Sequence, residues 1–511
     1  MVSKMTQSQK PSFEEPPFSK IRAALWPIQN SELKKFLPLG AMMFLMLFNY
    51  TLLRNTKDAL LITAPACGAE VIPFLKPWTM ISAVLFFFIY AKLSNLLNRA
   101  CLFYTCLIPF LAFFAAFAFI IYPHREFLHP TLESVLALQN AYPNIKWMIS
   151  LYGSWSFAIF YILSELWGAI AFSLLFWQLA NEITRTQEAK RFYSFFGFLG
   201  NLALIIAGSF GEYLSHLHRN SLSEGAAWEM SISYMMSSVV VAGIGIIFIY
   251  DWMNRYVLTD PFYYDAANNV GNKKKEDKPS LSLRESLAYI LSSKYLGFIA
   301  ILLMSYGIVS NLIDVTWKSQ LKAYFPHSND YFAFMGRFSY WTGITTILFI
   351  LAAKGIVNRF GWFTGAIITP FMILLTSACF FSFVIFQENL NEVVGLVGMT
   401  SISMAVMIGA LQNILSKGTK YSLFDPTKEM AYIPLDQELK VKGKAAVDII
   451  GSRLGKSGGG LIQFILLTFT TGGQLAIAPY LFVIITGISL TWIGAVKGLS
   501  KLYNAKITQI S

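Results

Sequence analysis

Charged residues are scarce in this chain. Only 13% of its 511 residues are Asp, Glu, Lys or Arg, whereas 55% are hydrophobic. A soluble domain carries about 25% charged residues, because its surface must stay hydrated. The shortage excludes a soluble globular enzyme, a disordered chain and a secreted disulfide scaffold. The composition therefore predicts a polytopic membrane protein.

Cysteine and histidine are also rare. The four cysteines, Cys67, Cys101, Cys106 and Cys379, form no metal-binding or redox spacing, which predicts buried or lipid-facing thiols. All five histidines fall in predicted loops on one side of the membrane, so none is available as a proton relay within it. We therefore expect no metal and no cofactor.

Basic residues exceed acidic ones, giving a net charge of +12. In a membrane protein this excess indicates cytoplasmic loops that face anionic membrane lipids, and not nucleic-acid binding. Residues 1–35 are polar and contain several prolines, without a short apolar core before a cleavage site. No signal peptide is expected in this segment.

Long apolar runs fill the rest of the chain, and a helix needs about 20 such residues to cross the bilayer core. The first six runs lie at about 36–64, 71–97, 101–122, 147–183, 187–214 and 229–255. The second six lie at about 294–322, 330–353, 361–386, 392–416, 444–471 and 475–497. The pattern predicts an all-α membrane protein with 12 transmembrane helices in two six-helix halves, similar to the major facilitator transporters.

This pattern also predicts the domain organisation. We expect a cytoplasmic N-terminal segment (1–35), an N-terminal bundle (36–256), a cytoplasmic linker (257–293), a C-terminal bundle (294–497) and a cytoplasmic tail (498–511). Most Lys and Arg residues fall in the termini and in the loops on their side, so both termini are predicted to be cytoplasmic. Residues 54–58 (Arg-Asn-Thr-Lys-Asp) and 314–318 (Asp-Val-Thr-Trp-Lys) are offset by 260, as are the starts of the halves, which indicates parallel repeats.

Several ionisable residues lie inside the predicted spans, where each costs about 2.5–3.5 kcal/mol or more at the helix centre. Lys57 and Glu165 are too deep to extend to the membrane surface, which favours a role in a water-filled cavity. Asp58 could simply neutralise Lys57. For Arg337, near a span end, structural pairing and ligand contact remain open. Lys318, Lys322 and Glu182 also lie near span ends, and for these we expect the side chains to reach the surface. The other intramembrane charges considered are Arg54, Asp314, Asp448, Arg453 and Lys456.

The basic groups in the spans outnumber the acidic ones, which suits a multiply charged anion as substrate. Arg54 and Lys57 from the first half, with Lys456, Arg337 and Arg453 from the second, are predicted to hold phosphate groups. The segment Gly455-Lys456-Ser457 is not a Walker A motif, because position 450 is Ile and no strand precedes it. ATP hydrolysis is therefore not expected.

Five segments carry a resemblance to a known family. They are Leu53 to Asp58, Ser164 to Gly168, Asn311 to Lys318, Tyr432 to Asp436, and Lys442 to Ala446 followed by Gly455 to Gly459. Together they resemble the ATP/ADP translocases of obligate intracellular bacteria and plastids, and the chlamydial members most. The resemblance covers about residues 35–497.

The resemblance implies an antiporter of a bacterial inner membrane that imports host ATP in exchange for ADP, with phosphate. It also implies that Lys57, Glu165, Asp314 and Lys456 are required for transport. Plastid members have Glu at the position of Asp314, so this chain keeps the negative charge on a shorter side chain. We expect alternating access by a single chain, with membrane lipids as the other partner.

Two alternatives remain open. A proton-coupled or broader-specificity nucleotide transporter of the same family would use Glu165 or Asp314 as a proton carrier. A membrane-embedded enzyme would need a metal or acid–base cluster near one membrane face, and no such cluster occurs in the predicted spans. The sequence therefore predicts a transporter and not an enzyme.

Overall fold

The protein is described here by a computed structural model covering residues 28–219, 221–260, 263, 293–396, 398–436, 443–470 and 472–510. These residues form helices and short connections, and the described part of the chain contains no strand. The predicted all-helical class is therefore confirmed for the described residues.

The long helices divide between the two halves of the sequence. The first half forms α2 (Leu33–Ile62), α3 (Val71–Leu96), α4 (Arg99–Ala116), α8 (Trp155–Trp167), α9 (Trp177–Ile183), α10 (Thr186–His216) and α11 (Glu224–Tyr256). The second half forms α14 (Lys294–Tyr324), α15 (Ser328–Ile385), α17 (Ser401–Thr419), α18 (Asp425–Tyr432), α19 (Lys444–Phe469) and α20 (Gly473–Ile510). Two π-helical segments, η4 (Gly168–Phe176) and η5 (Lys420–Phe424), join α8 to α9 and α17 to α18.

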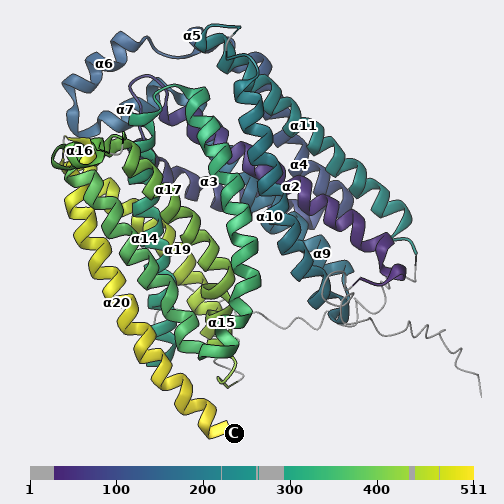
Figure 1. The fold of residues 1–511 in the computed structure, drawn as a ribbon. Helices are drawn as coiled ribbons and strands as arrows, with labels where there is room; N and C mark the ends of the chain where they lie inside the picture. Colours follow the sequence, from purple (N-terminus) through teal and green to yellow (C-terminus); the bar gives the residue numbers. More distant parts are fainter. Residues whose placement is uncertain are drawn as a thin grey trace, which may run out of the picture.

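The two sets of helices lie side by side (Figure 1). The short helices α5 (Arg125–Leu128), α6 (Leu132–Ala141), α7 (Lys146–Gly153) and α16 (Gln387–Gly395) gather at one end of the molecule, which we call the α6 end. The C-terminus lies at the opposite end, which we call the C-terminal end.

Nine helices in the described residues are long and apolar enough to cross a membrane. A multi-pass membrane protein is therefore confirmed, whereas the count of twelve stays a prediction. Helix α15 is interrupted at Gly361, whose φ of 80° and ψ of 177° are non-helical, so its two parts run in different directions. This break falls at the boundary between the predicted runs 330–353 and 361–386.

Two predicted runs are shorter in the structure than in the sequence analysis. The run at 147–183 is broken at Ser154, which has ψ 41°, so the membrane-spanning part begins at Trp155. The run at 392–416 is divided between α16 and α17, since Gly398 has a φ of 72° and Thr400 caps α17 through Ser403. Hydropathy alone cannot detect such breaks, because the residues on both sides are apolar.

The predicted domain boundaries stay predictions. Residues 1–27 of the N-terminal segment and most of the linker 257–293 lie outside the described residues. Over the predicted tail, α20 continues as a helix to Ile510.

The halves approach most closely where α10 meets α15. A Cβ atom added to Gly208 would lie 2.5 Å from the carbonyl oxygen of Gly336, and one added to Gly336 would lie 2.7 Å from the carbonyl oxygen of Gly208. The two backbones can touch here because neither glycine has a side chain. Small residues allow the same close approach between other membrane helices.

We expect Gly208→Ala to lower the melting temperature of the purified protein, because the added methyl group forces α10 away from α15. Overpacking of this kind costs about 1–3 kcal/mol. Gly197→Ala on the same helix is the matched control, since a Cβ there meets no atom within 4 Å. Equal melting temperatures for the two variants would contradict the predicted close contact.

Candidate functional site

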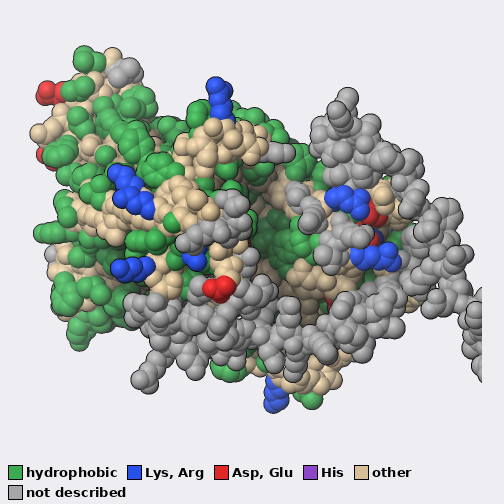
Figure 2. Space-filling view, turned by 90° about the horizontal axis from the view of Figure 1, so that it is seen from below, with side chains coloured by type: hydrophobic (Ala, Val, Ile, Leu, Met, Phe, Trp, Pro, Cys, Tyr) green, Lys and Arg blue, Asp and Glu red, His purple; other side chains and the backbone are tan. Residues whose placement is uncertain are grey.

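A cavity of about 630 Å³ lies between the two halves. Its walls come from α2, α3 and α8 on one side and from α14, α15, α17, η5, α18 and α19 on the other. Viewed from the C-terminal end, the surface is hollowed between the two sets of helices (Figure 2). The volume lies within the range of small-molecule sites, about 300–1,000 Å³.

Contacts between the halves close the α6 end. Arg219 of the first half lies 3.1 Å from Asp330 of the second, and His327 lies 2.8 Å from Glu224. The hydroxyl groups of Thr63 and Ser328 are 2.6 Å apart. The cavity is therefore closed on the α6 side and reached from the C-terminal end.

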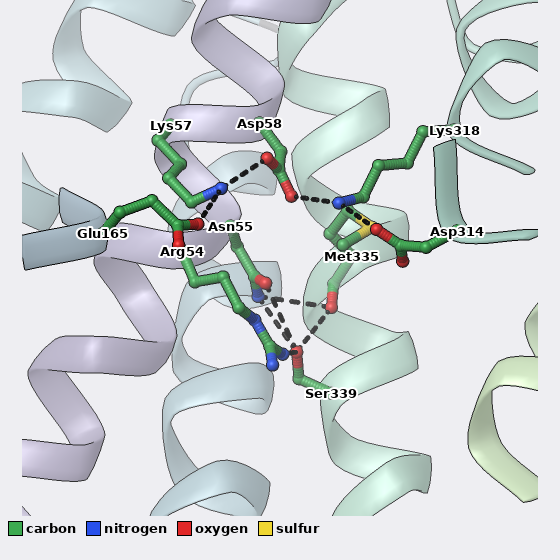
Figure 3. Close-up of polar contacts among 9 residues, drawn as sticks. All are labelled: Arg54, Asn55, Lys57, Asp58, Glu165, Asp314, Lys318, Met335 and Ser339. Carbon is green, nitrogen blue, oxygen red and sulfur yellow. Dashed lines mark hydrogen bonds and ion pairs between the residues drawn. The ribbon is translucent and has the colours of Figure 1, made fainter. Parts of the chain in front are cut away.

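A chain of five charged side chains lies in the cavity (Figure 3). Lys57 Nζ lies 2.8 Å from Asp58 Oδ1 and 2.9 Å from Glu165 Oε1. Lys318 Nζ lies 2.9 Å from Asp58 Oδ2 and 2.7 Å from Asp314 Oδ2. We call this chain, Glu165–Lys57–Asp58–Lys318–Asp314, the charge network.

The charge network crosses from one half to the other. Asp58 belongs to α2 of the first half and Lys318 to α14 of the second, and both side chains are almost fully buried. Lys318 and Asp314 are one helical turn apart, so α14 brings them to the same face. Lys57 also lies over the Tyr161 ring, 3.7 Å from its centre. Each buried cation therefore has at least two compensating partners.

The structure brings together four of the residues predicted from the sequence. Arg54, Lys57, Glu165 and Asp314 all line the cavity. Arg337 is not among the residues that line it: its guanidinium binds Glu212 Oε1 through Nε at 3.0 Å, between α15 and α10. The backbones of Arg453 and Lys456 lie in α19, but their side chains lie outside the described part of the structure, as does that of Asp448.

The prediction that Lys318 reaches the membrane surface is wrong, because its side chain is buried in the charge network. Lys322 is partly buried and donates to the carbonyl oxygen of Cys67 in the other half, so its reach to the surface stays a prediction. Distance from a span end was the only basis of that prediction, and it cannot reveal a partner across the interface. Glu182, which lies near the end of α9, pairs with Arg99 of α4 at 2.8 Å and remains one-third exposed.

Four further cations line the cavity but were not identified from the sequence: Lys76 on α3, Lys417 on α17, Lys420 on η5 and Lys428 on α18. Lys76 lies at the start of the run 71–97 and was not singled out, and the predicted span ended at 416, so the other three fell outside it. The spacing of Asn413, Ser416, Lys417 and Lys420 follows one face of a helix, and this pattern could have identified Lys417 and Lys420.

The sequence matches a known family along almost its whole length. Residues 12–503 match the family described as TLC ATP/ADP transporter. The chain is 50% identical to ADP,ATP carrier protein 1 of Chlamydia trachomatis, over 96% of this chain and 93% of that one. It is 45% identical to ADP,ATP carrier protein 1 of Rickettsia prowazekii, over 96% and 97% of the two chains. It is also 45% identical to the chloroplastic ADP,ATP carrier protein 2 of Arabidopsis thaliana, over 95% and 77%.

Solved structures share the fold at low sequence identity. A bacterial homologue of the iron transporter ferroportin, in an inward-facing state, matches with a TM-score of 0.59 and 13% identity, over 93% of this chain and 100% of that one. The nucleoside transporter NupG matches with a TM-score of 0.54 and 12% identity, over 93% and 100%. These likenesses confirm a fold similar to that of major facilitator transporters.

We expect the Asp58–Lys318 pair to show strong coupling in a double-mutant cycle. Asp58→Asn or Lys318→Met alone leaves a buried charge with fewer partners, which costs about 3–5 kcal/mol. The double variant should lose less than the sum of the two single losses, measured as the free energy of unfolding in detergent.

The Arg219–Asp330 pair is the matched control, because it also joins the halves but its arginine is 53% exposed. Its cycle should give a coupling of about 1 kcal/mol or less. Equal coupling energies for the two pairs would contradict the prediction that the buried charge network stabilises the fold more than an exposed ion pair between the halves.

Proposed function

The chain belongs to the TLC ATP/ADP transporter family, and from this premise we propose that it exchanges ATP for ADP across a bacterial inner membrane. ATP enters the cell as ADP leaves it, accompanied by phosphate. The observation that carries this proposal is the cavity, which lies between two helical halves and has an excess of positive charge. Transport, and not catalysis, is the activity assigned to it.

The charge of the cavity fits a nucleotide. Seven Lys or Arg residues and four Asp or Glu residues line it, which leaves an excess of three positive charges among the described lining residues. ADP and ATP carry about three and four negative charges at neutral pH. Either nucleotide therefore compensates the excess.

The proposed mechanism is alternating access around this cavity. The proposal includes twelve membrane-spanning segments in two halves, with the domain boundaries predicted from the sequence. It also places both termini in the cytoplasm and takes a single chain as the working unit. The C-terminal end then faces the cytoplasm, and the cavity is open inwards. Opening to the outside requires the contacts at the α6 end, together with the Asp58–Lys318 pair, to separate.

The excess charge also accounts for obligatory exchange. When the cavity is closed at both ends, its uncompensated cations are withdrawn from water, at a cost of several kcal/mol for each ion. A bound nucleotide removes this cost by neutralising the charge. The empty transporter is thereby hindered from crossing to the other state, and a nucleotide must leave for each one that enters.

The proposed substrate site comprises Arg54, Lys57, Glu165 and Asp314, because these line the cavity. Arg337 is left out of it, because it pairs with Glu212 outside the cavity lining. Arg453 and Lys456 stay predictions from the sequence.

We expect liposomes that contain the protein to take up labelled ATP only when they are preloaded with ADP or ATP. Liposomes that are empty or preloaded with AMP serve as controls for leakage and for nucleotide class. An imposed pH gradient should not change the rate.

Uptake into empty liposomes that follows the proton gradient would contradict exchange. That result would support the proton-coupled alternative, with Glu165 or Asp314 as the proton carrier. Equal uptake of guanine nucleotides would instead support a broader-specificity transporter.

A further inference from the structure

The cations of the cavity fall into two classes. Lys57 and Lys318 belong to the charge network, Lys420 lies 3.1 Å from Asp425, and Lys428 lies 2.9 Å from Glu429. The three others are Arg54, Lys76 and Lys417, and none of them has a carboxylate within ion-pair distance among the side chains that the structure describes. Their number equals the excess positive charge of the cavity lining.

Arg54 and Lys417 face each other across the boundary between the halves. Arg54 of α2 donates a long hydrogen bond of 3.5 Å to Ser339 Oγ, and Lys417 Nζ of α17 lies 4.4 Å from the ring centre of Phe338. Ser339 and Phe338 are consecutive residues of α15. Both cations therefore line the same cavity beside consecutive residues of α15, and neither has a described carboxylate within ion-pair distance.

Lys76 contributes a third charge from α3. Its stem lies against Gly460 of α19, where an added Cβ would be 3.1 Å from Lys76 Cγ. Lys76 lines the same cavity as the five residues of the charge network, so its charge is added to the field in that cavity. Glu165 is already bound to Lys57 at 2.9 Å, which leaves Lys76 able to receive another anion.

We propose that Arg54, Lys76 and Lys417 bind the polyphosphate chain of the nucleotide in the cavity that is open to the C-terminal end, whereas Lys57 and Lys318 stay bound to their carboxylates in this state and hold the halves in register. The inference rests on the proposed function and names the side chains that carry its phosphate selectivity. An anion that relieves repulsion between existing cations gains more than one that must first break an ion pair, because no desolvated carboxylate is left behind. Since Arg54 and Lys76 belong to the first half and Lys417 to the second, one polyphosphate joins both halves.

The test is the binding of ATP, ADP and AMP to the purified full-length protein in detergent, measured by calorimetry. Arg54→Gln, Lys76→Gln and Lys417→Gln should each weaken ATP binding about 10- to 100-fold, the value of one charged hydrogen bond. The loss should be smaller for AMP, which has one phosphate. Lys417→Arg should recover most of the loss.

Lys420→Gln is the matched comparison, because it removes the same charge from the same cavity but from a cation already paired with Asp425. It should weaken ATP binding less than any of the three variants. The melting temperature without nucleotide provides a second readout. It should be unchanged or higher in Arg54→Gln and Lys417→Gln, because each relieves a repulsion and breaks no ion pair.

Equal losses in Lys417→Gln and Lys420→Gln would overturn the proposal, since they would show that only the total charge of the cavity matters. Unweakened ATP binding in all three variants would overturn it as well. Both results presuppose that the wild-type protein binds and exchanges ATP and ADP. Failure of the wild type to do so would instead refute the proposed function.

Discussion

The buried ion pair between Asp58 and Lys318 is the interaction on which the arrangement of the two halves depends. Asp58 binds Lys57 of its own helix and Lys318 of the opposite half through different oxygens, so one carboxylate fixes both cations. Charges withdrawn from water are costly unless each is paired. The halves must therefore keep a defined register for this pair to form, and the glycine contact between α10 and α15 sets the same register by shape.

The charged side chains of the cavity have two different electrostatic roles. The charge network pairs each of its two lysines with two carboxylates and contributes structure, whereas Arg54, Lys76 and Lys417 supply the field that an anion meets. Because these three cations have no carboxylate partner among the described side chains, a bound anion compensates them and the protein responds to the charge of what it carries. A neutral nucleoside of similar size would fit the volume and leave the field uncompensated.

Much of this could be predicted from the sequence. Apolar runs indicated the membrane helices, and charges deep within them identified Arg54, Lys57, Glu165 and Asp314, because the cost of burial leaves few reasons for such residues. Lys318 and Lys417 were misjudged, since hydropathy measures depth along one helix and not the neighbour across an interface. Arg337 also lies within a predicted span, near its end, but its side chain points to Glu212 between α10 and α15. Whether each of these side chains lines the cavity depends on the direction in which it points around its helix axis, and that direction is set by packing.

The predicted internal repeat has a consequence for the relation between the two halves. Asp58 and Lys318 are separated by the repeat offset of 260 residues, and so are Arg54 and Asp314, with opposite charges at both pairs of positions. Two copies of the first half would place aspartate against aspartate at the centre, and two copies of the second would place lysine against lysine. The halves have thus become complementary and no longer interchangeable. Loss or replacement of either half would leave a buried charge of the other half without its partner.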